Sequence, residues 1–471
     1  MLFNTPQFVI FLFIFLFFWF ILSGKCKKIT LLLVSYGFAY FLGEIWTVVI
    51  LAAITVLTYF WGMLIFRTRF RKLLLVLYLA FILMIMGAGR YAPQISNLTH
   101  IYLPKFALNV PWITLIGLSY YSLSAISYIV DIFRGTDKPD RNFLDVSLWL
   151  ALFPKFISGP IERHNELKNQ LNNLADIKFD IERIKMGLLI CSCGYFYKII
   201  IADRLGFFVD SVYADLLNLA GFPLFIAFIF YSLQIYFDFC GYSMIAFGIS
   251  HVMGITISEN FDHPYFSAGI TEFWRRWHLS LSSWLRDYIY IPLGGNRKGR
   301  IRQYLNILLT FLVSGIWHGA GINYIIWGAL HGIYQVIEKM AGNKIKLPRF
   351  VQIIITFFSV SFAWIFFRSD SVRTARNFIK HMIFRYPKLE ANNSLTNYGL
   401  DFADWIVLSA ALVIAFTAEI LQYKGIHLYK LLQKQNIVIR WFFYYLIVAV
   451  LVIFGIYGPQ FDANNFIYFR Y

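Results

Sequence analysis

Residues 314–332 read S-G-I-W-H-G-A-G-I-N-Y-I-I-W-G-A-L-H-G, an apolar stretch with histidines set between glycines. His318 lies between Gly315 and Gly319, which are four residues apart. Small residues at this spacing let two membrane helices approach closely, so we predict that the glycines are packing residues. Packing does not explain the histidine, because an imidazole is costly in a membrane span and is usually functional there. Burial favours the neutral ring, which is the form that a general base needs.

His331 repeats this arrangement between Gly328 and Gly332, at the far end of the next apolar run. We interpret this second pair of glycines as packing residues too. For His331 itself, a structural role is favoured over a catalytic one.

The composition of the whole chain indicates a membrane protein. Of its 471 residues, 59% are hydrophobic, 20% are aromatic and 14% are charged, whereas soluble domains carry about 25% charged residues. A soluble fold, a disordered chain and a secreted disulfide scaffold are therefore excluded. The net charge of +17 is typical of cytoplasmic loops that face anionic lipid. No basic stretch is long enough to form a nucleic-acid groove, so we expect no nucleic-acid partner.

Apolar runs long enough to cross a bilayer recur along the chain. Together with three shorter pieces they predict an all-α polytopic membrane protein with about 11–13 transmembrane or re-entrant helices. The first run is interpreted as a retained helix and not as a signal peptide. The long runs lie near 7–23, 28–43, 45–66, 72–89, 111–133, 184–202, 218–237, 303–319, 321–338, 350–367, 404–422 and 438–457, and the shorter pieces near 146–160, 239–255 and 284–293.

The distribution of Lys and Arg predicts the orientation of the chain. Positive charges cluster at 25–28 and at 67–72, whereas the minimal turn at Gly43 and Glu44 has none. Because cytoplasmic loops are enriched in positive charge, both clusters are expected in the cytoplasm and the N-terminus outside.

The segment 256–302 mixes basic and apolar residues and contains T-E-F-W-R-R-W-H-L-S-L-S-S-W-L-R-D-Y-I-Y-I-P-L-G-G at 271–295. If this stretch is one helix, Glu272 pairs with Arg276, and Trp274 shares a face with His278. Two interpretations remain open: a juxtamembrane anchor, or a site that holds a phosphate-bearing ligand beside a histidine. For the second, the candidate donor-binding residues are Arg275, Arg276, Arg286, Arg297 and Lys298, with Asp238 as a further polar candidate inside an apolar run.

Metal and nucleotide-hydrolysing chemistry have no support in the sequence. It contains no H-E-x-x-H, no phosphate loop and no nucleophile elbow. The four cysteines, which form no C-x-x-C pair, are interpreted as buried thiols. We therefore expect no metal.

Taken together, the two histidine segments resemble the membrane-bound O-acyltransferase (MBOAT) family. The similarity is to the bacterial branch that includes the membrane subunits for alginate and peptidoglycan O-acetylation, and it extends over essentially the whole chain. Further supporting stretches are M-L-F-N at 1–4, 119–134, F-P-K-F-I-S-G-P at 153–160, I-A-D-R-L at 201–205, 236–248 and F-I-Y-F-R at 466–470.

This resemblance implies an acyltransferase fold in which helices surround a central channel. His318 corresponds to the family's catalytic histidine, and His278 to its second important histidine. It implies one transmembrane domain over 1–471, with N-terminal spans at 1–133, a catalytic core at 134–340 and C-terminal spans at 341–471.

The resemblance also implies a reaction. A cytoplasmic acyl thioester, expected to be acetyl-CoA, is the donor substrate, and no cofactor is bound. The acyl group passes across the membrane to an extracytoplasmic cell-envelope polysaccharide, with an extracytoplasmic acetyltransferase- or esterase-like protein as partner. Membrane lipid surrounds the chain, and the bacterial inner membrane is the expected location.

Two alternative functions stay open on the sequence. The first is D-alanyl transfer to teichoic acid by the same fold, for which the chain is long. The second is a polytopic transporter without acyl-transfer chemistry, which many spans and broken helices would also suit.

Overall fold

The computed structural model describes residues 2–99, 117–157, 159–342, 347–384 and 398–457. In these ranges the regular structure is helical, and the one strand-like feature is an isolated bridge between Phe261 and Trp277. This confirms the all-α prediction. The motif at 466–470, and the first residues of the run at 111–133, lie outside the described residues.

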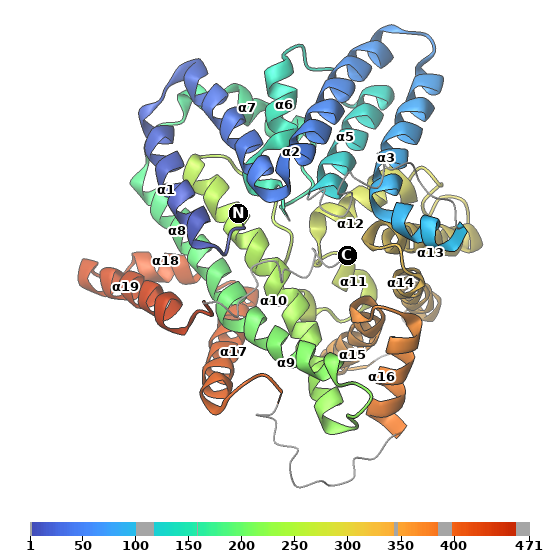
Figure 1. Cartoon of the computed structure of the whole chain (residues 1–471), viewed down its shortest axis with the longest axis vertical. Helices are drawn as coiled ribbons and strands as arrows, with labels where there is room; N and C mark the ends of the chain where they lie inside the picture. The colour runs from blue at the N-terminus through green and yellow to red at the C-terminus, as the bar shows by residue number, and fades with distance from the viewer. Residues whose placement is uncertain (1, 100–116, 158, 343–346, 385–397, 458–471) are drawn as a thin grey trace. The chain divides into compact units, whose positions relative to one another are not determined.

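The helices follow one another along the chain as Figure 1 shows. The α-helices are α1 (Pro6–Ile21), α2 (Gly24–Arg67), α3 (Arg71–Thr99), α5 (Leu118–Arg134), α6 (Phe143–Ala151), α7 (His164–Asn172), α8 (Ile181–Tyr195), α9 (Asp203–Ala214), α10 (Phe222–Met253), α11 (Ile270–Trp274), α12 (Leu279–Leu285), α13 (Arg300–His318), α14 (Ile322–Ala341), α15 (Arg349–Arg368), α16 (Val372–Phe384), α17 (Phe402–Tyr423), α18 (Leu428–Gln433) and α19 (Ile437–Phe454). Short 3₁₀ turns are η2 (Phe153–Lys155), η3 (Leu174–Asp176) and η5 (Pro264–Phe266), and π-helical turns are η4 (Phe196–Ala202) and η6 (Arg286–Tyr290).

Seven helices in the described ranges are long and apolar enough to cross a membrane. They are α2, α3, the continuous helix from α8 through α9, α10, α15, α17 and α19. The sequence predicts a larger number because it divides α2 into two spans and also includes α1, α5, α13 and α14. The backbone of α2 does break between the two predicted spans. Gly43 and Glu44 have non-helical φ and ψ angles, at the position of the predicted turn.

The chain forms two compact units, each built from two segments. The first comprises residues 1–188 and 246–259, and the second comprises residues 189–245 and 260–471. In the first unit α2 packs against α5 and α6, and Lys28 forms an ion pair with Asp145 of α6. The second unit contains both histidine segments, 271–295 and 314–332. The organisation as one transmembrane domain over 1–471 stays a prediction.

In the second unit, α13 and α14 pack closely against each other. A methyl group on Gly315 would lie 2.4 Å from the carbonyl oxygen of Tyr324, and one on Gly328 would lie 2.3 Å from that of Phe311. Neither contact leaves room for a side chain, because the obstacle is the backbone of the facing helix. The predicted packing role of these glycines is confirmed.

Replacing Gly315 by Ala tests this contact. The added methyl must push α14 away from α13, and overpacking of this kind typically costs about 1–3 kcal/mol of unfolding free energy. We expect a Tm several degrees below that of the wild type in thermal unfolding of the detergent-purified protein.

Gly37→Ala is the matched control, because Gly37 is also inside a helix but a methyl there meets nothing within 4 Å. Alanine is the better helix former, so this variant should keep or slightly raise the Tm. Equal melting temperatures for the two variants would show that the helices are not in close contact at Gly315.

Candidate active site

His318 is the last residue of α13 and is 4% exposed. Its ring packs edge-to-face against Trp317 of the same helix, Trp327 of α14 and Phe367 of α15, with ring centroids 4.6, 4.9 and 5.3 Å away. Three helices thus hold one imidazole among aromatic side chains.

This position suits a group that takes up a proton. The C-terminal end of a helix carries a partial negative charge, which favours a positive charge on a nearby side chain. The surrounding aromatic side chains keep water away from the ring, and electrostatic interactions are stronger where water is excluded.

His278 lies in the turn between α11 and α12 and is fully buried. Its ring lies edge-to-face against Phe239, with centroids 4.7 Å apart, and 6.3 Å from the ring of Trp317. Trp317 therefore lies next to both histidines, so the structure brings the two predicted residues to one place. Burial lowers the pKa of His278 to about 3, so the ring is neutral at physiological pH.

The backbone at His278 adopts a left-handed conformation, with φ of 44°. Such a conformation costs about 1–3 kcal/mol for a residue with a side chain and persists only when its surroundings impose it. Asn260 does so: its carbonyl accepts a hydrogen bond from the Leu279 amide at 3.0 Å, and its Oδ1 accepts one from the Ser280 hydroxyl at 2.7 Å. Its Nδ2 donates to Ser243 Oγ at 3.2 Å. Sequence reasoning missed Asn260, because nothing in the chain indicates contacts with residues 17 to 20 positions away.

The geometry also corrects one detail of the sequence prediction. Glu272 and Arg276 do pair, at 3.0 Å, as predicted. However, α11 ends at Trp274 and α12 begins at Leu279, so Trp274 and His278 do not share a helical face. Instead, Trp274 Nε1 donates a hydrogen bond to Nδ1 of His331 at 3.2 Å, inside a cluster of aromatic rings. This bond supports the structural interpretation of His331.

The basic candidates for donor binding differ in their surroundings. Arg276 lies 3.6 Å from Asp262 and over the ring of Tyr423, in addition to its bond with Glu272. Arg286 is exposed and pairs with Asp287 at 2.7 Å. The remaining three, Arg275, Arg297 and Lys298, are exposed. Nothing in these positions tests a role in donor binding, which stays a prediction.

Asp238 is 1% exposed and forms part of a buried ionic cluster. Lys198 lies 2.7 Å from Asp238 and 2.7 Å from Asp203, and above the ring of Tyr242. Lys198 and Asp203 are five residues apart, at the π-helical turn η4, which the sequence does not predict. A role of Asp238 in donor binding stays a prediction.

A second buried polar cluster surrounds Glu419 of α17. The hydroxyls of Tyr197 and Tyr236 each donate to its Oε1 at 2.8 Å, and His263 contacts its other oxygen. Among the described residues, no group of three or more His, Cys, Asp or Glu side chains is arranged to hold a metal ion.

Comparison with known proteins identifies the family. The model of the membrane-bound O-acyltransferase family matches residues 45–371, more than half of the chain and both histidine segments. The chain belongs to the MBOAT family. It is therefore a multi-pass membrane protein and an O-acyltransferase.

Similarity to individual relatives extends beyond the matched range. The chain is 37% identical to the probable alginate O-acetylase AlgI of Pseudomonas fluorescens, over 88% of this chain and 82% of the relative. It is 32% identical to the peptidoglycan O-acetyltransferase of Helicobacter pylori, over 81% of this chain and 80% of the relative. The teichoic acid D-alanyltransferase of Bacillus subtilis is 29% identical, over 54% of this chain and 69% of the relative. This MBOAT protein thus resembles the O-acetylating members over more of its length.

Variants of His278 separate the role of its ring from that of its backbone. Asparagine tolerates the left-handed conformation better than most residues, whereas alanine does not. We expect His278→Asn to keep a near-normal Tm and lose most acyl-transfer activity, and His278→Ala to lose both. Near-wild-type activity in His278→Asn would show that the turn matters and the imidazole does not.

Proposed function

We propose that this MBOAT protein moves an acetyl group from cytoplasmic acetyl-CoA across the bacterial inner membrane, for O-acetylation of an extracytoplasmic cell-envelope polysaccharide. The observation that carries the proposal is the burial of His318 among aromatic rings at the end of α13, next to the ring that also borders His278. The similarity to the alginate and peptidoglycan O-acetylating proteins over more than four fifths of the chain supports the choice of acetyl and of a polysaccharide.

The proposed reaction needs one proton acceptor and one positioned thioester. Neutral His318 takes the proton from the acceptor hydroxyl while the hydroxyl oxygen forms a bond to the thioester carbonyl carbon. The carbon–sulfur bond then breaks, and the departing thiolate takes the proton from the imidazolium. The products are the acetate ester and the free thiol, and His318 is neutral again. The partial negative charge at the end of α13 favours the imidazolium stage.

His278 is assigned a different task in this scheme. Its ring is neutral and bordered by Phe239 and Trp317, so it has no charge with which to hold an anion. A neutral imidazole can donate one hydrogen bond, and we assign it the orientation of the thioester or of the acceptor hydroxyl beside His318.

The resemblance to the MBOAT family implies the donor and the partner protein, and the predicted orientation of the chain gives the side on which each is met. The exposed basic residues Arg275, Arg297 and Lys298 are suited to the phosphates of coenzyme A on the cytoplasmic side. In this proposal the polysaccharide is outside, and the acceptor hydroxyl belongs to an extracytoplasmic acetyltransferase- or esterase-like partner, which then passes the acetyl group to the polysaccharide. The competing proposal of D-alanyl transfer is supported by similarity to the D-alanyltransferase over a smaller part of the chain. Membership of an O-acyltransferase family argues against a transporter.

Replacing His318 by Ala in the producing bacterium tests the catalytic role. We expect ester-linked acetate on the envelope polysaccharide to fall by at least about 10²-fold, which is within the usual contribution of a general base. The protein should remain at a normal level in the membrane. Acetate is measured after mild alkaline release from the isolated polysaccharide.

His427→Ala is the control for this experiment, because His427 is exposed and precedes the short helix α18. It should keep wild-type acetylation. If neither variant loses acetate, His318 is not the base. Loss of a D-alanyl ester in place of acetate would support the competing proposal.

Single cysteines test the proposed sidedness, in a chain whose four native cysteines are replaced. Glu44 and Lys298 are both exposed, and the charge distribution predicts that Glu44 lies outside and Lys298 inside. An impermeant thiol reagent applied to intact cells should therefore label Glu44→Cys and not Lys298→Cys. Labelling of Lys298→Cys from outside would overturn the orientation and with it the donor path.

A further inference from the structure

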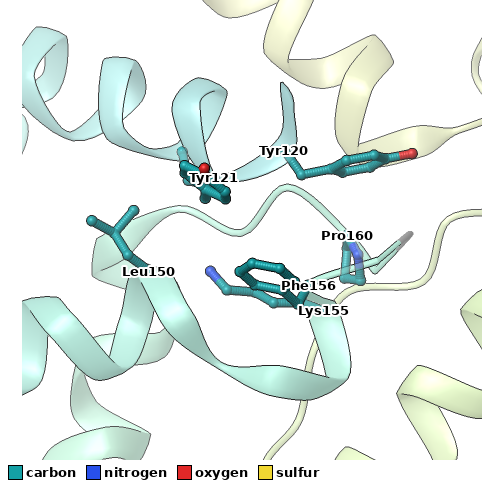
Figure 2. A pocket seen from close by; sticks show the side chains of 7 residues that line it. Tyr120, Tyr121, Leu150, Lys155, Phe156 and Pro160 are labelled. Carbon is teal, nitrogen blue, oxygen red and sulfur yellow. The ribbon is translucent and has the colours of Figure 1, made fainter. Parts of the chain in front are cut away.

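A small pocket in the first compact unit lies beside Lys155 (Figure 2). Its free space holds about one water molecule, so the pocket is too small for a substrate or a cofactor. The Glu419 cluster of the second unit, which consists of Glu419, Tyr197, Tyr236 and His263, is more informative, because its contacts lead toward the acyl-transfer site.

Glu419 is a buried carboxylate on α17, a helix that is long and apolar enough to cross a membrane. The hydroxyls of Tyr197 and Tyr236 donate to its Oε1, and Nδ1 of His263 contacts its Oε2. A charge in a membrane-spanning helix is costly unless it is paired. Of these three partners only His263 can carry a positive charge, so the histidine is the one that can form an ion pair with Glu419.

His263 lies in the loop between α10 and α11, outside the helices that could cross the membrane. Burial lowers the pKa of its ring, but the hydrogen bond to Glu419 and the charge of that carboxylate outweigh burial and raise the pKa above its ordinary value. Asp262 acts in the same direction as Glu419, and Arg276 acts against it. His263 therefore keeps its proton to a higher pH than an ordinary histidine does.

The other charged and titratable groups near His263 have partners of their own. The Arg276 guanidinium lies 3.6 Å from the Asp262 carboxylate and 3.0 Å from that of Glu272. It also lies over the ring of Tyr423 of α17, whose centroid is 6.2 Å from that of the His263 ring. The carboxylate on α17 is thus the acid in direct contact with the histidine.

The backbone at His263 is left-handed, with φ of 46°. His278 has almost the same angle, 44°, and Glu44 is the one other non-glycine residue with positive φ in the described ranges. Such a conformation costs about 1–3 kcal/mol and persists only when its surroundings impose it. The contact with Glu419 supplies that constraint at His263.

The backbone before His263 pairs with the backbone around His278. Phe261 and Trp277 form an isolated antiparallel bridge, and their rings meet edge-to-face with centroids 5.1 Å apart. Backbone hydrogen bonds of 3.0 Å on either side of the bridge hold the two segments together. Asn260, which holds the turn at His278, directly precedes Phe261. A displacement of His263 would therefore reach that turn.

We propose that Glu419 is a positioning residue, which holds His263 and thereby the turn that carries His278. The constraint passes through the bridge between Phe261 and Trp277. Glu419 does not touch the reacting groups and is not a catalytic residue. Because the ion pair is complete while His263 is protonated, the turn is held most firmly at low pH and less firmly as the pH rises above the pKa of His263. This inference rests on the orienting role proposed for His278.

The first test compares acyl transfer in inverted membrane vesicles, with labelled acetyl-CoA as the donor and rates divided by the amount of protein. In His263→Asn the side-chain amide takes the place of Nδ1 and asparagine tolerates the left-handed backbone, so the contact is kept without the charge. At about pH 6 the wild type should be severalfold faster than His263→Asn, and the two rates should converge by about pH 9, where His263 has lost its proton. Glu419→Gln should be about tenfold slower than the wild type at neutral pH, which is the value of one charge-assisted hydrogen bond.

The second test follows hydrogen exchange in the purified full-length protein and needs no reaction. The amides of residues 260–279 should exchange severalfold faster in Glu419→Gln than in the wild type, because the loop opens more often. The amides of α13 should stay as protected as in the wild type. This contrast separates release of the loop from a general loss of stability.

His427→Asn is the matched control, because His427 is exposed and precedes α18. It should follow the wild type at each pH. A constant ratio of the rates of the wild type and His263→Asn over the whole pH range would overturn the proposal, and so would normal exchange of residues 260–279 in Glu419→Gln. If wild-type vesicles transfer no label, acetyl-CoA is not the donor, and the exchange measurement alone decides the role of Glu419. If Glu419→Gln does not fold, exchange and the pH dependence are judged on His263→Asn, whose loop should exchange faster than that of the wild type at low pH.

Discussion

The close backbone contact between α13 and α14 is the constraint on which the site depends. Gly315 and Gly328 let each helix approach the main chain of the other, and this contact brings Trp327 within reach of the end of α13. His318 then has aromatic neighbours on three helices and a helix C-terminus behind it. A membrane offers no hydrophobic force between helices, so van der Waals packing through small residues is what can fix such a geometry.

A different structural feature, a left-handed turn, positions the second histidine, His278. His278 occupies a left-handed turn that one buried amide, Asn260, holds through its main chain and side chain. The turn brings the ring to Trp317, the residue that also adjoins His318. A rigid helix end thus meets a strained turn at one tryptophan. Separate positioning of the two histidines is useful in an O-acyltransferase, because proton transfer and orientation of the thioester require different groups at fixed positions.

The sequence predicted the features that depend on neighbours along the chain. These include the helical fold, the break at Gly43 and Glu44, the packing glycines and the bond between Glu272 and Arg276. It did not predict contacts made across the fold, such as the Asn260 hydrogen bonds and the buried ion pairs of Lys198. The helical spacing that pairs Glu272 with Arg276 also placed Trp274 and His278 on one face, whereas the chain turns sharply at His278. A left-handed residue imposed by a distant amide leaves no local pattern that could reveal it.

We propose that the acetyl group enters from the cytoplasm and reaches a hydroxyl outside by way of His318. The most direct measurement supplies radiolabelled acetyl-CoA to sealed membrane vesicles of the producing bacterium, either inverted or right-side-out, and counts the alkali-labile label on the polysaccharide. We expect label in inverted vesicles, where the cytoplasmic face meets the donor, and none in right-side-out vesicles. Equal labelling in both orientations, or labelling in right-side-out vesicles alone, would contradict it.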